Sequence, residues 1–199
     1  MPKEGYIYSV PNQDYPDGNF STCPKPNPEI KEALMEGIKV CKDYDADILI
    51  ATDPDCDRVG TAVKHKGEYV LVTGNEMGCL LLNYILSQKT QEDILPKGSI
   101  AVKTIVTSEL TRKIANKYGV ELKNVLTGFK YIGSIITDLE KHMNRSKFVF
   151  GFEESYGYLA GTFVRDKEAV STSLLIAEMT EYYKTLNKTL ELNELYEEI

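Results

Sequence analysis

The stretch ILIATDPDCDRVG, residues 48–60, joins an apolar run directly to a cluster of like charges. Residues 48–51 have the composition of a buried strand, and Asp53, Asp55 and Asp57 follow at alternate positions. Side chains at alternate positions of an extended backbone point to one side, so the three carboxylates can converge on one point. Two carboxylates about 4 Å apart repel each other by roughly 1 kcal/mol even in water. The stretch therefore predicts a cation at the end of a core strand.

The residue types in this stretch favour Mg²⁺ beside a bound phosphate. A hard divalent cation suits an all-oxygen cluster, and Mg²⁺ commonly keeps open positions for phosphate oxygens. Arg58 adds a planar guanidinium that can bind a phosphate next to the cation. A solvated acidic turn is the plain alternative. A phosphatase of the haloacid-dehalogenase type, with Asp53 as nucleophile, is a third reading, although Asp57 stands where that motif usually has Thr or Val.

An EF-hand is a poor match for the same stretch. The sixth position of such a calcium loop should be Gly and the twelfth Glu, but Arg58 and Lys64 occupy them here. Calcium binding of that kind is therefore not expected.

On both sides of residues 48–60, strand-like segments alternate with helical patterns, which predicts an α/β fold with sheets covered by helices. The polar segment SQKTQEDILPKGS, residues 87–99, predicts a division into domains 1–93 and 94–199. We expect strands at 6–10, 48–51, 61–64, 69–73, 100–106, 120–125 and 147–151, and helices at 27–43, 75–87, 109–118, 131–142, 168–184 and near the C-terminus.

The composition excludes several classes of function. The net charge of −7, without a dense run of Lys or Arg, argues against nucleic acid as a partner. No apolar run approaches the roughly 18 residues of a membrane span, and the first residues lack the apolar core of a signal peptide. The four cysteines form no CxxC pair, which favours reduced thiols. We therefore expect a cytoplasmic protein without a membrane anchor.

Three stretches, taken together, resemble the α-D-phosphohexomutases, the phosphoglucomutase and phosphomannomutase family. TDPDCDR, residues 52–58, resembles the magnesium loop of that family. LTGFKYIG, residues 126–133, resembles a loop of its third domain, and GFEESYGYLAGTFVRDKEAV, residues 151–170, resembles its sugar-specificity loop. The three matches follow the order and spacing of the family over most of the chain.

The resemblance implies a particular part of a longer enzyme. Members of the family have four domains, of which the first carries a phosphorylated serine in a TASHNP-like loop and the last an RPSGTEP-like phosphate loop. Neither motif occurs in these 199 residues. The chain therefore resembles domains 2 and 3, with the opening strand and helix of domain 2 missing, as two consecutive α/β domains that each have a mixed sheet. Its partners would be domains 1 and 4 of the same protein.

The resemblance also implies roles for individual residues, all carried over by motif position. Asp53, Asp55 and Asp57 would hold Mg²⁺. The catalytic and substrate-binding residues would be Arg58 and Lys130 beside the phosphate and sugar, together with Glu153 and Ser155 on the sugar hydroxyls. A carboxylate and a hydroxyl are suitable hydrogen-bonding partners for such hydroxyls. The substrate would be a hexose phosphate.

EESYG, residues 153–157, indicates which branch of the family the chain resembles most. The phosphomannomutase branch has a histidine where Gly157 stands, so a phosphoglucomutase is the first interpretation, and the general base stays open. Phosphomannomutase, phosphopentomutase and a noncatalytic module that binds metal or sugar phosphate are the alternatives. Residues 165–167, Arg-Asp-Lys, are expected to be a solvated cap before a helix, with a phosphate or interdomain contact as the alternative.

Overall fold

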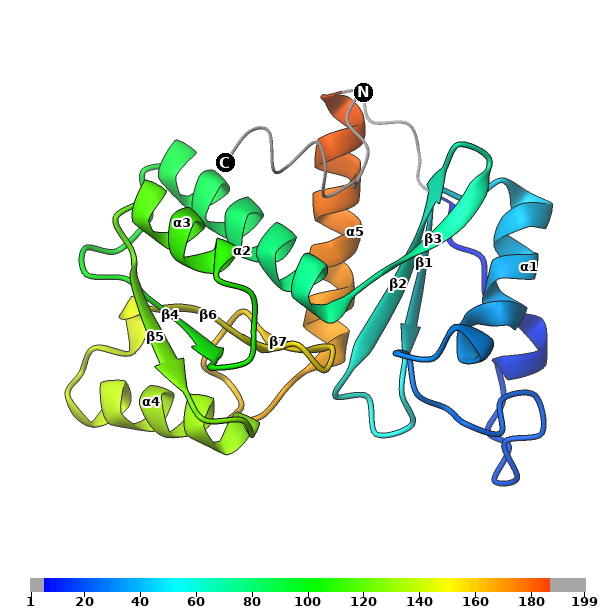
Figure 1. Cartoon of the computed structure of the whole chain (residues 1–199), viewed down its shortest axis with the longest axis horizontal. Helices are drawn as coiled ribbons and strands as arrows, with labels where there is room; N and C mark the ends of the chain where they lie inside the picture. The colour runs from blue at the N-terminus through cyan, green and yellow to red at the C-terminus, as the bar shows by residue number, and fades with distance from the viewer. Residues whose placement is uncertain (1–5, 187–199) are drawn as a thin grey trace.

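The strands of the chain form two sheets, as the computed structural model shows for residues 6–186 (Figure 1). The first sheet has the order β1-β2-β3 and the second the order β5-β4-β6-β7. The elements are η1 (Pro11–Gln13), η2 (Lys31–Leu34), α1 (Met35–Tyr44), β1 (Ile48–Thr52), β2 (Val59–His65), β3 (Glu68–Val72), α2 (Gly74–Gln91), β4 (Ile100–Thr104), α3 (Leu110–Lys117), β5 (Glu121–Val125), α4 (Phe129–Lys141), η3 (Arg145–Lys147), β6 (Phe148–Glu153), β7 (Gly157–Leu159) and α5 (Ala169–Thr185).

The first sheet is an antiparallel meander. Strands β1 and β2 are joined by the aspartate loop, and β2 and β3 by a tight hairpin. The two hairpin residues, Lys66 and Gly67, both have positive φ angles, of 47° and 85°, as a type I′ turn requires. Leu49 packs with helix α1 in a small core on one face, while Ile48 and Ile50 face the main core.

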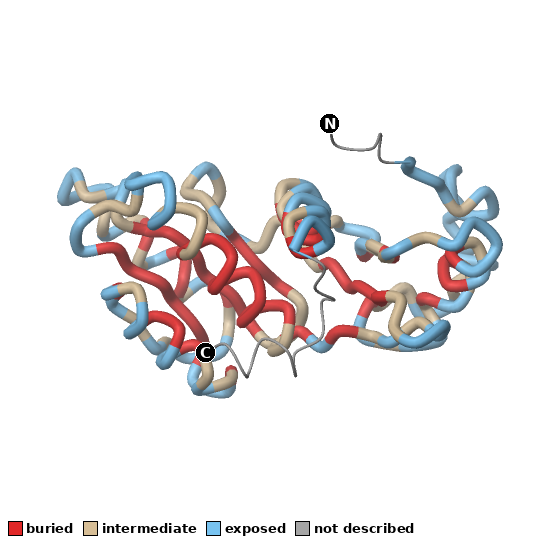
Figure 2. The backbone as a smooth tube through the Cα atoms, turned by 90° about the horizontal axis from the view of Figure 1, so that it is seen from above, coloured by how far each residue is buried: buried red, intermediate tan, exposed pale blue. Residues whose placement is uncertain are grey.

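The second sheet is mixed and carries helices on both faces. Strands β5, β4 and β6 are parallel, and β7 runs antiparallel to β6. Helix α4 packs on one face, with Ile132 and Ile136 against Val102 of β4. Helices α2 and α3 cover the other face, and α5 lies between the two sheets, in contact with β1, β2 and β7 (Figure 1). Buried segments run through the strands of both sheets and through α2 (Figure 2).

The predicted α/β fold with two sheets and covering helices is confirmed, with one difference in detail. The described strand pairs of the first sheet are all antiparallel, so only the second sheet is mixed. The predicted division after residue 93 falls in the loop between α2 and β4. Helix α2 packs against helix α3 and against strand β6 of the second sheet. The position of the domain boundary stays a prediction.

Four sequence-based predictions need correction. Residues 6–10 form no strand, because no neighbouring strand pairs with them, and Ile7 is 98% exposed. The helix expected from residue 27 begins only at Lys31, as a 3-10 turn, because Asn27 closes a turn with the amide of Glu29. Strand β7 was not expected, and α4 begins at Phe129 rather than at residue 131.

Two remaining predictions concern the C-terminus and membranes. The helix expected near the C-terminus lies outside the described residues. Among residues 6–186, no helix is long and apolar enough to cross a membrane.

Candidate functional site

The three aspartates lie in the loop that connects β1 to β2. The amide of Asp53 donates to the carbonyl of Arg58 at 3.3 Å, and the amide of Cys56 donates to the carbonyl of Asp53 at 3.0 Å. Cys56 has a φ of 57°, which reverses the chain within the loop. One carboxylate oxygen from each of Asp53, Asp55 and Asp57 lies within 4.8 Å of the others. The expected convergence of the carboxylates is present, although a turn rather than an extended strand produces it.

Asp53 is the buried anchor of this loop. Its Oδ1 accepts hydrogen bonds from the amides of Asp57 at 3.2 Å and Arg58 at 3.0 Å. Its Oδ2 accepts from Nε of Arg58 at 2.7 Å. Burial by itself would raise the pKa of Asp53, but the hydrogen bonds and charge of Arg58 outweigh it and leave the pKa below its ordinary value. Asp53 is therefore a carboxylate at neutral pH, whereas Asp55 is exposed.

Arg58 is held between the aspartate loop and the segment before α1. Besides Asp53, its Nε lies 3.8 Å from Asp57, and its Nη1 lies 3.4 Å from the Asn27 side-chain oxygen and 3.5 Å from Glu29. Burial acts to lower the pKa of Arg58, but the hydrogen bond to Asp53 and the surrounding carboxylates raise it. The guanidinium therefore stays charged and oriented. The contacts with Asn27 and Glu29 have no signal in the sequence, because they join residues about thirty positions apart.

Lys167 is the second cation at this site, at a position where the sequence favoured a solvated cap and left a phosphate or interdomain contact as the alternative. Its Nζ lies 2.7 Å from Oδ2 of Asp57 and 3.2 Å from Oδ1 of Asp166, and it also lies over the ring of Phe129 at 5.9 Å. Its side chain is only 18% exposed, so the prediction of a solvated cap is wrong for this residue. Burial lowers its pKa, but the hydrogen bond to Asp57 outweighs that effect and raises it. The aliphatic part of Lys167 passes over Gly157, where an added Cβ would lie 2.1 Å from its Cδ.

Backbone contacts join the aspartate loop to the loop at residues 153–157. Arg58 and Gly157 form an isolated antiparallel bridge, and the amide of Val59 donates to the carbonyl of Tyr156 at 3.1 Å. The amide of Ala169 donates to the carbonyl of Cys56 at 3.2 Å, which fixes the start of α5 against the same loop. Two segments about a hundred residues apart in sequence are therefore held together by backbone hydrogen bonds.

Glu153 ends β6 with its side chain buried. Its Oε1 accepts a hydrogen bond from the amide of Gly128 at 2.7 Å, and Gly128 has a φ of 111°, which favours glycine. Burial raises the pKa of Glu153, and the hydrogen bond from Gly128 together with the charge of Lys167 only partly opposes this. The contact connects residues 126–130 to the end of β6. The three sequence stretches that resemble the family are thus brought to one place.

The neighbours of Glu153 differ in their surroundings. Glu154 accepts a hydrogen bond from Oγ1 of Thr104 at 2.9 Å, and Ser155 is half-buried. Lys130 is exposed in the first turn of α4, with its Nζ 5.1 Å from the centre of the Tyr131 ring. Within residues 6–186 it forms no ion pair with the aspartate loop. The structure thus leaves Lys130 at the edge of the site and puts Lys167 at its centre.

The carboxylates and cationic side chains at this site can hold a metal cation and a negatively charged ligand together. Arg58 and Lys167 offset part of the negative charge of the three aspartates, whereas Glu29 and Asp166 add to it. A divalent cation would offset more of that charge and offer a positive centre to a phosphate oxygen. Exposed Asp55 leaves one side of the carboxylate cluster open to such an ion.

Comparisons with known proteins match almost the whole chain. Residues 3–67 match the family model described as phosphoglucomutase/phosphomannomutase, alpha/beta/alpha domain II, and residues 73–198 match alpha/beta/alpha domain III. A curated phosphoglucomutase from Staphylococcus aureus strain USA300 is 41% identical over 193 residues, which cover 96% of this chain and 34% of that protein. The protein from strain N315 is 40% identical over the same coverage. The chain spans about a third of the length of these relatives.

Solved structures agree at the level of the fold. A putative phosphomannomutase from Thermus thermophilus superposes with a TM-score of 0.64 at 23% identity, over 83% of this chain and 33% of that chain. A phosphoglucomutase/phosphomannomutase family protein from Burkholderia thailandensis gives a TM-score of 0.66 at 18% identity, over 83% and 32%.

Proposed function

Because the chain belongs to the phosphoglucomutase/phosphomannomutase family, we propose that it forms the metal-binding and sugar-binding middle part of a phosphoglucomutase. The observation that carries this proposal is the direct hydrogen bonding between the aspartate loop and residues 153–157. A metal-bound phosphate and the hydroxyls of the attached sugar need neighbouring binding groups, and this junction holds the proposed metal ligands close to the proposed sugar-binding residues. The proposed division into domains 1–93 and 94–199 puts the site where the two domains meet.

Mg²⁺ is the proposed metal, held by Asp53, Asp55 and Asp57. The set consists only of carboxylate oxygens, which are the ligands that Mg²⁺ prefers. The lowered pKa of Asp53 keeps that ligand ionised at neutral pH. When bound, Mg²⁺ would offset negative charge as a phosphoryl group is transferred.

The proposed roles of the other residues follow from their charge and position. Arg58 would orient the phosphate beside the metal, because its guanidinium is fixed by Asp53. Glu153 and Ser155 would bind sugar hydroxyls. Lys130 would reach the phosphate or sugar from the first turn of α4, where a bound anion would offset its unfavourable position in the helix dipole.

The proposed reaction of the longer protein converts glucose 1-phosphate to glucose 6-phosphate. A phosphoserine would transfer its phosphoryl group to the 6-hydroxyl, giving glucose 1,6-bisphosphate and a free serine. After the bisphosphate reorients, the serine would take the phosphoryl group from position 1. Since these 199 residues contain neither the serine loop nor the final phosphate loop, we expect the isolated chain to be inactive. The four free cysteines fit a reducing compartment such as the cytoplasm.

The phosphatase reading is weaker, because the chain belongs to the phosphoglucomutase/phosphomannomutase family and Asp57 stands where the phosphatase motif usually has Thr or Val. The noncatalytic module remains the second candidate, because the same site could bind a metal without taking part in turnover.

Calorimetric titration with Mn²⁺ and Mg²⁺ tests the metal site on this chain. We expect saturable binding that is lost in Asp55→Asn, because Asp55 is an exposed member of the carboxylate cluster. Asp43→Asn, at an exposed position on α1, is the matched control and should bind as the wild type does. Equal binding by wild type and Asp55→Asn would remove the aspartates from the proposal.

A second titration, with glucose 1,6-bisphosphate in the presence of metal, separates the two candidates. The mutase proposal expects weak binding that falls further in Glu153→Gln. If a version of the protein with the serine and phosphate domains restored binds metal but does not interconvert glucose phosphates, the noncatalytic module is favoured.

A further inference from the structure

The loop at residues 153–157 turns strand β6 back into strand β7 within three residues. Glu153 pairs with Gly157, so residues 154–156 form the turn of this hairpin. Tyr156 has a φ of 66°, a left-handed conformation that glycine usually adopts at the end of a three-residue hairpin loop. A bulky residue in that conformation is strained and persists only where its surroundings hold it. The contacts around the turn therefore decide how its tip is presented.

One of these contacts is a hydrogen bond from strand β4. The hydroxyl of Thr104, the last residue of β4, donates to Oε2 of Glu154 at 2.9 Å. Because Thr104 is fully buried and Glu154 is half-buried, water has little access to replace this donor. The preceding carboxylate, Glu153, has a different partner, the amide of Gly128. The two adjacent carboxylates are thus fixed separately, each by its own donor.

Thr104 is itself fixed by a buried lysine. The ammonium of Lys103 donates to the carbonyls of Thr104 at 3.3 Å and Thr107 at 3.0 Å. It also pairs with Glu109 at 2.9 Å, and its side chain has no exposed surface. The amide and the hydroxyl of Thr107 donate to the carbonyl of Thr104 as well, at 3.2 and 2.6 Å. This buried network holds the end of β4 that carries the donor to Glu154.

The start of helix α2 gives the loop a second support. A Cβ added to Gly74 would lie 1.9 Å from the carbonyl oxygen of Glu154, so the backbone of the loop rests directly on the helix. The hydroxyl of Tyr158 donates to the carbonyl of Gly74 at 3.4 Å. Asn75, the next residue of α2, accepts a hydrogen bond from the amide of Ser108 at 2.8 Å. The helix is thereby tied to the segment that follows β4, and both supports belong to one hydrogen-bonded frame.

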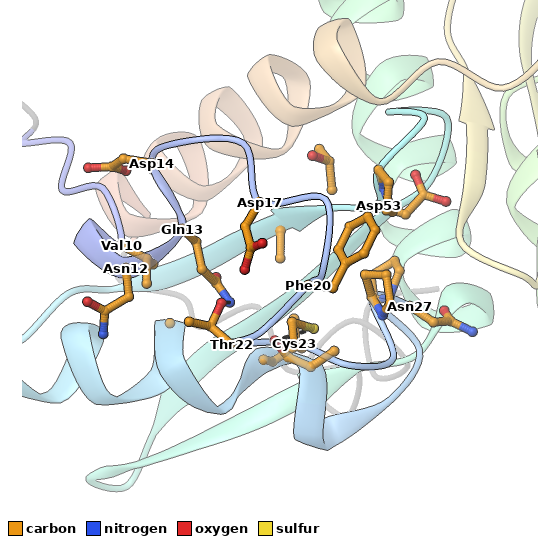
Figure 3. Close-up of a pocket in the computed structure, with 18 of the residues that line it drawn as sticks. Val10, Asn12, Gln13, Asp14, Asp17, Phe20, Thr22, Cys23, Asn27 and Asp53 are labelled. Atoms are coloured by element: carbon orange, nitrogen blue, oxygen red, sulfur yellow. Dashed lines mark hydrogen bonds between the residues drawn. The ribbon is translucent and has the colours of Figure 1, made fainter.

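This frame is separate from the hollow beside the aspartate loop. Figure 3 shows that hollow with Asp53 at one end and with Val10 and Phe20 around it. The described residues that line it include neither Thr104 nor any residue of the loop at 153–157. The contacts that hold the turn therefore do not depend on what occupies the hollow.

We propose that Glu154 is a positioning residue, which fixes the turn through its hydrogen bond with Thr104 so that Glu153 and Ser155 face a bound sugar. The inference rests on the proposed function for the identity of that ligand. Glu154 does not bind the sugar itself, because its carboxylate is bonded to the end of β4. Without the hydroxyl of Thr104, the half-buried carboxylate loses its donor, and the turn shifts to bring it to water.

Hydrogen exchange of this chain tests whether the bond fixes the turn. The amide of Val59 donates to the carbonyl of Tyr156 at 3.1 Å, so its exchange rate reports on the position of the turn. Thr104→Val removes the donor with little change in volume and should speed exchange at Val59 by about tenfold. Thr104→Ser keeps the hydroxyl and should exchange as the wild type does. The matched control is Thr180→Val in α5, which loses a buried hydrogen bond to the carbonyl of Ile176 and should leave Val59 unchanged.

Calorimetric titration measures the effect on the proposed ligand. With Mn²⁺ present, glucose 1,6-bisphosphate should bind about tenfold more weakly to Thr104→Val and to Glu154→Leu than to the wild type. Thr104→Ser should restore the wild-type Kd. The Kd for Mn²⁺ alone should stay the same in all variants, because neither residue is a proposed metal ligand. The double variant should bind no more weakly than either single variant, because both changes remove the same bond.

The outcomes separate this inference from the proposed function. Faster exchange at Val59 and weaker bisphosphate binding in Thr104→Val, with neither change in Thr180→Val, would support the positioning role. Equal effects of these two variants, or additive losses in the double variant, would overturn it. If the wild type binds Mn²⁺ but no bisphosphate, the proposed sugar site is wrong, whereas exchange at Val59 still decides whether Thr104 holds the turn.

Discussion

Lys167→Met is expected to strengthen divalent metal binding at the aspartate loop. In the structure the Lys167 ammonium lies 2.7 Å from Asp57, so it occupies a position that a bound cation would have to share. The raised pKa of Lys167 means that the ammonium stays charged throughout the neutral range. Methionine keeps a similar chain length over Gly157 and removes the charge. The variant therefore removes repulsion without removing any proposed metal ligand.

The size of the effect follows from the separation of the charges. A metal ion bound to the Asp57 carboxylate would lie roughly 5 Å from the ammonium, given metal–oxygen distances of about 2.1 Å. A single and a double charge at that separation repel by about 2 kcal/mol in a water-like medium, and by more at a lower dielectric. Because the lysine can move aside at the cost of its ion pair, we expect a gain of about 1–2 kcal/mol. That gain is roughly a five- to thirtyfold lower Kd.

Calorimetric titration with Mn²⁺ at neutral pH measures this effect. The matched control is Lys184→Met, because Lys184 forms a comparable ion pair with Asp47, at 2.8 Å, at the opposite end of β1. That variant should leave the Kd unchanged. An unchanged or higher Kd in Lys167→Met, with wild-type affinity in the control, would refute the idea that the lysine competes with the metal.

Three further predictions concern the stability of the fold. Gly78→Ala should destabilise the chain by about 1–3 kcal/mol in urea unfolding, because the new Cβ would lie 2.0 Å from the ring of Phe152. A smaller loss of stability would mean that helix α2 and strand β6 can move apart to accommodate the methyl group. Lys103→Met should lower the free energy of unfolding by a similar amount, about 1–3 kcal/mol, because the fully buried ammonium donates to two carbonyl oxygens and pairs with Glu109. The control is Glu109→Gln, which changes only the exposed partner and should destabilise the chain less. Burial raises the pKa of Glu153 in the folded chain above its ordinary value of 4.5, so the protonated side chain stabilises the folded state at low pH. That contribution to the free energy of unfolding is lost as the pH rises above 4.5 and the side chain ionises. Glu153→Gln should remove this loss, so the difference between variant and wild type in urea unfolding should change with pH above about 4.5, and parallel curves would contradict the assignment.

The local elements could be predicted from the sequence because each depends on short-range chemistry. The apolar run before Asp53, the hairpin at Lys66 and Gly67 and the periodic helices α2, α3 and α5 all have signals within a few residues. The convergence of the aspartates was also predictable, since a short loop after a strand leaves them little freedom to separate. The identification of the family rested on the same local motifs.

The tertiary structure alone decided which distant residues complete the site and which segments find partners. Lys167 belongs to the aspartate cluster because α5 begins against Cys56, and Arg58 meets Asn27 because a loop passes close to it. Residues 6–10 have the composition of a strand, yet a strand forms only where a neighbour satisfies its backbone groups, and that neighbour is not implied by their sequence. Propensity and charge are properties of a segment, whereas pairing, burial and pKa depend on what the rest of the chain brings to it.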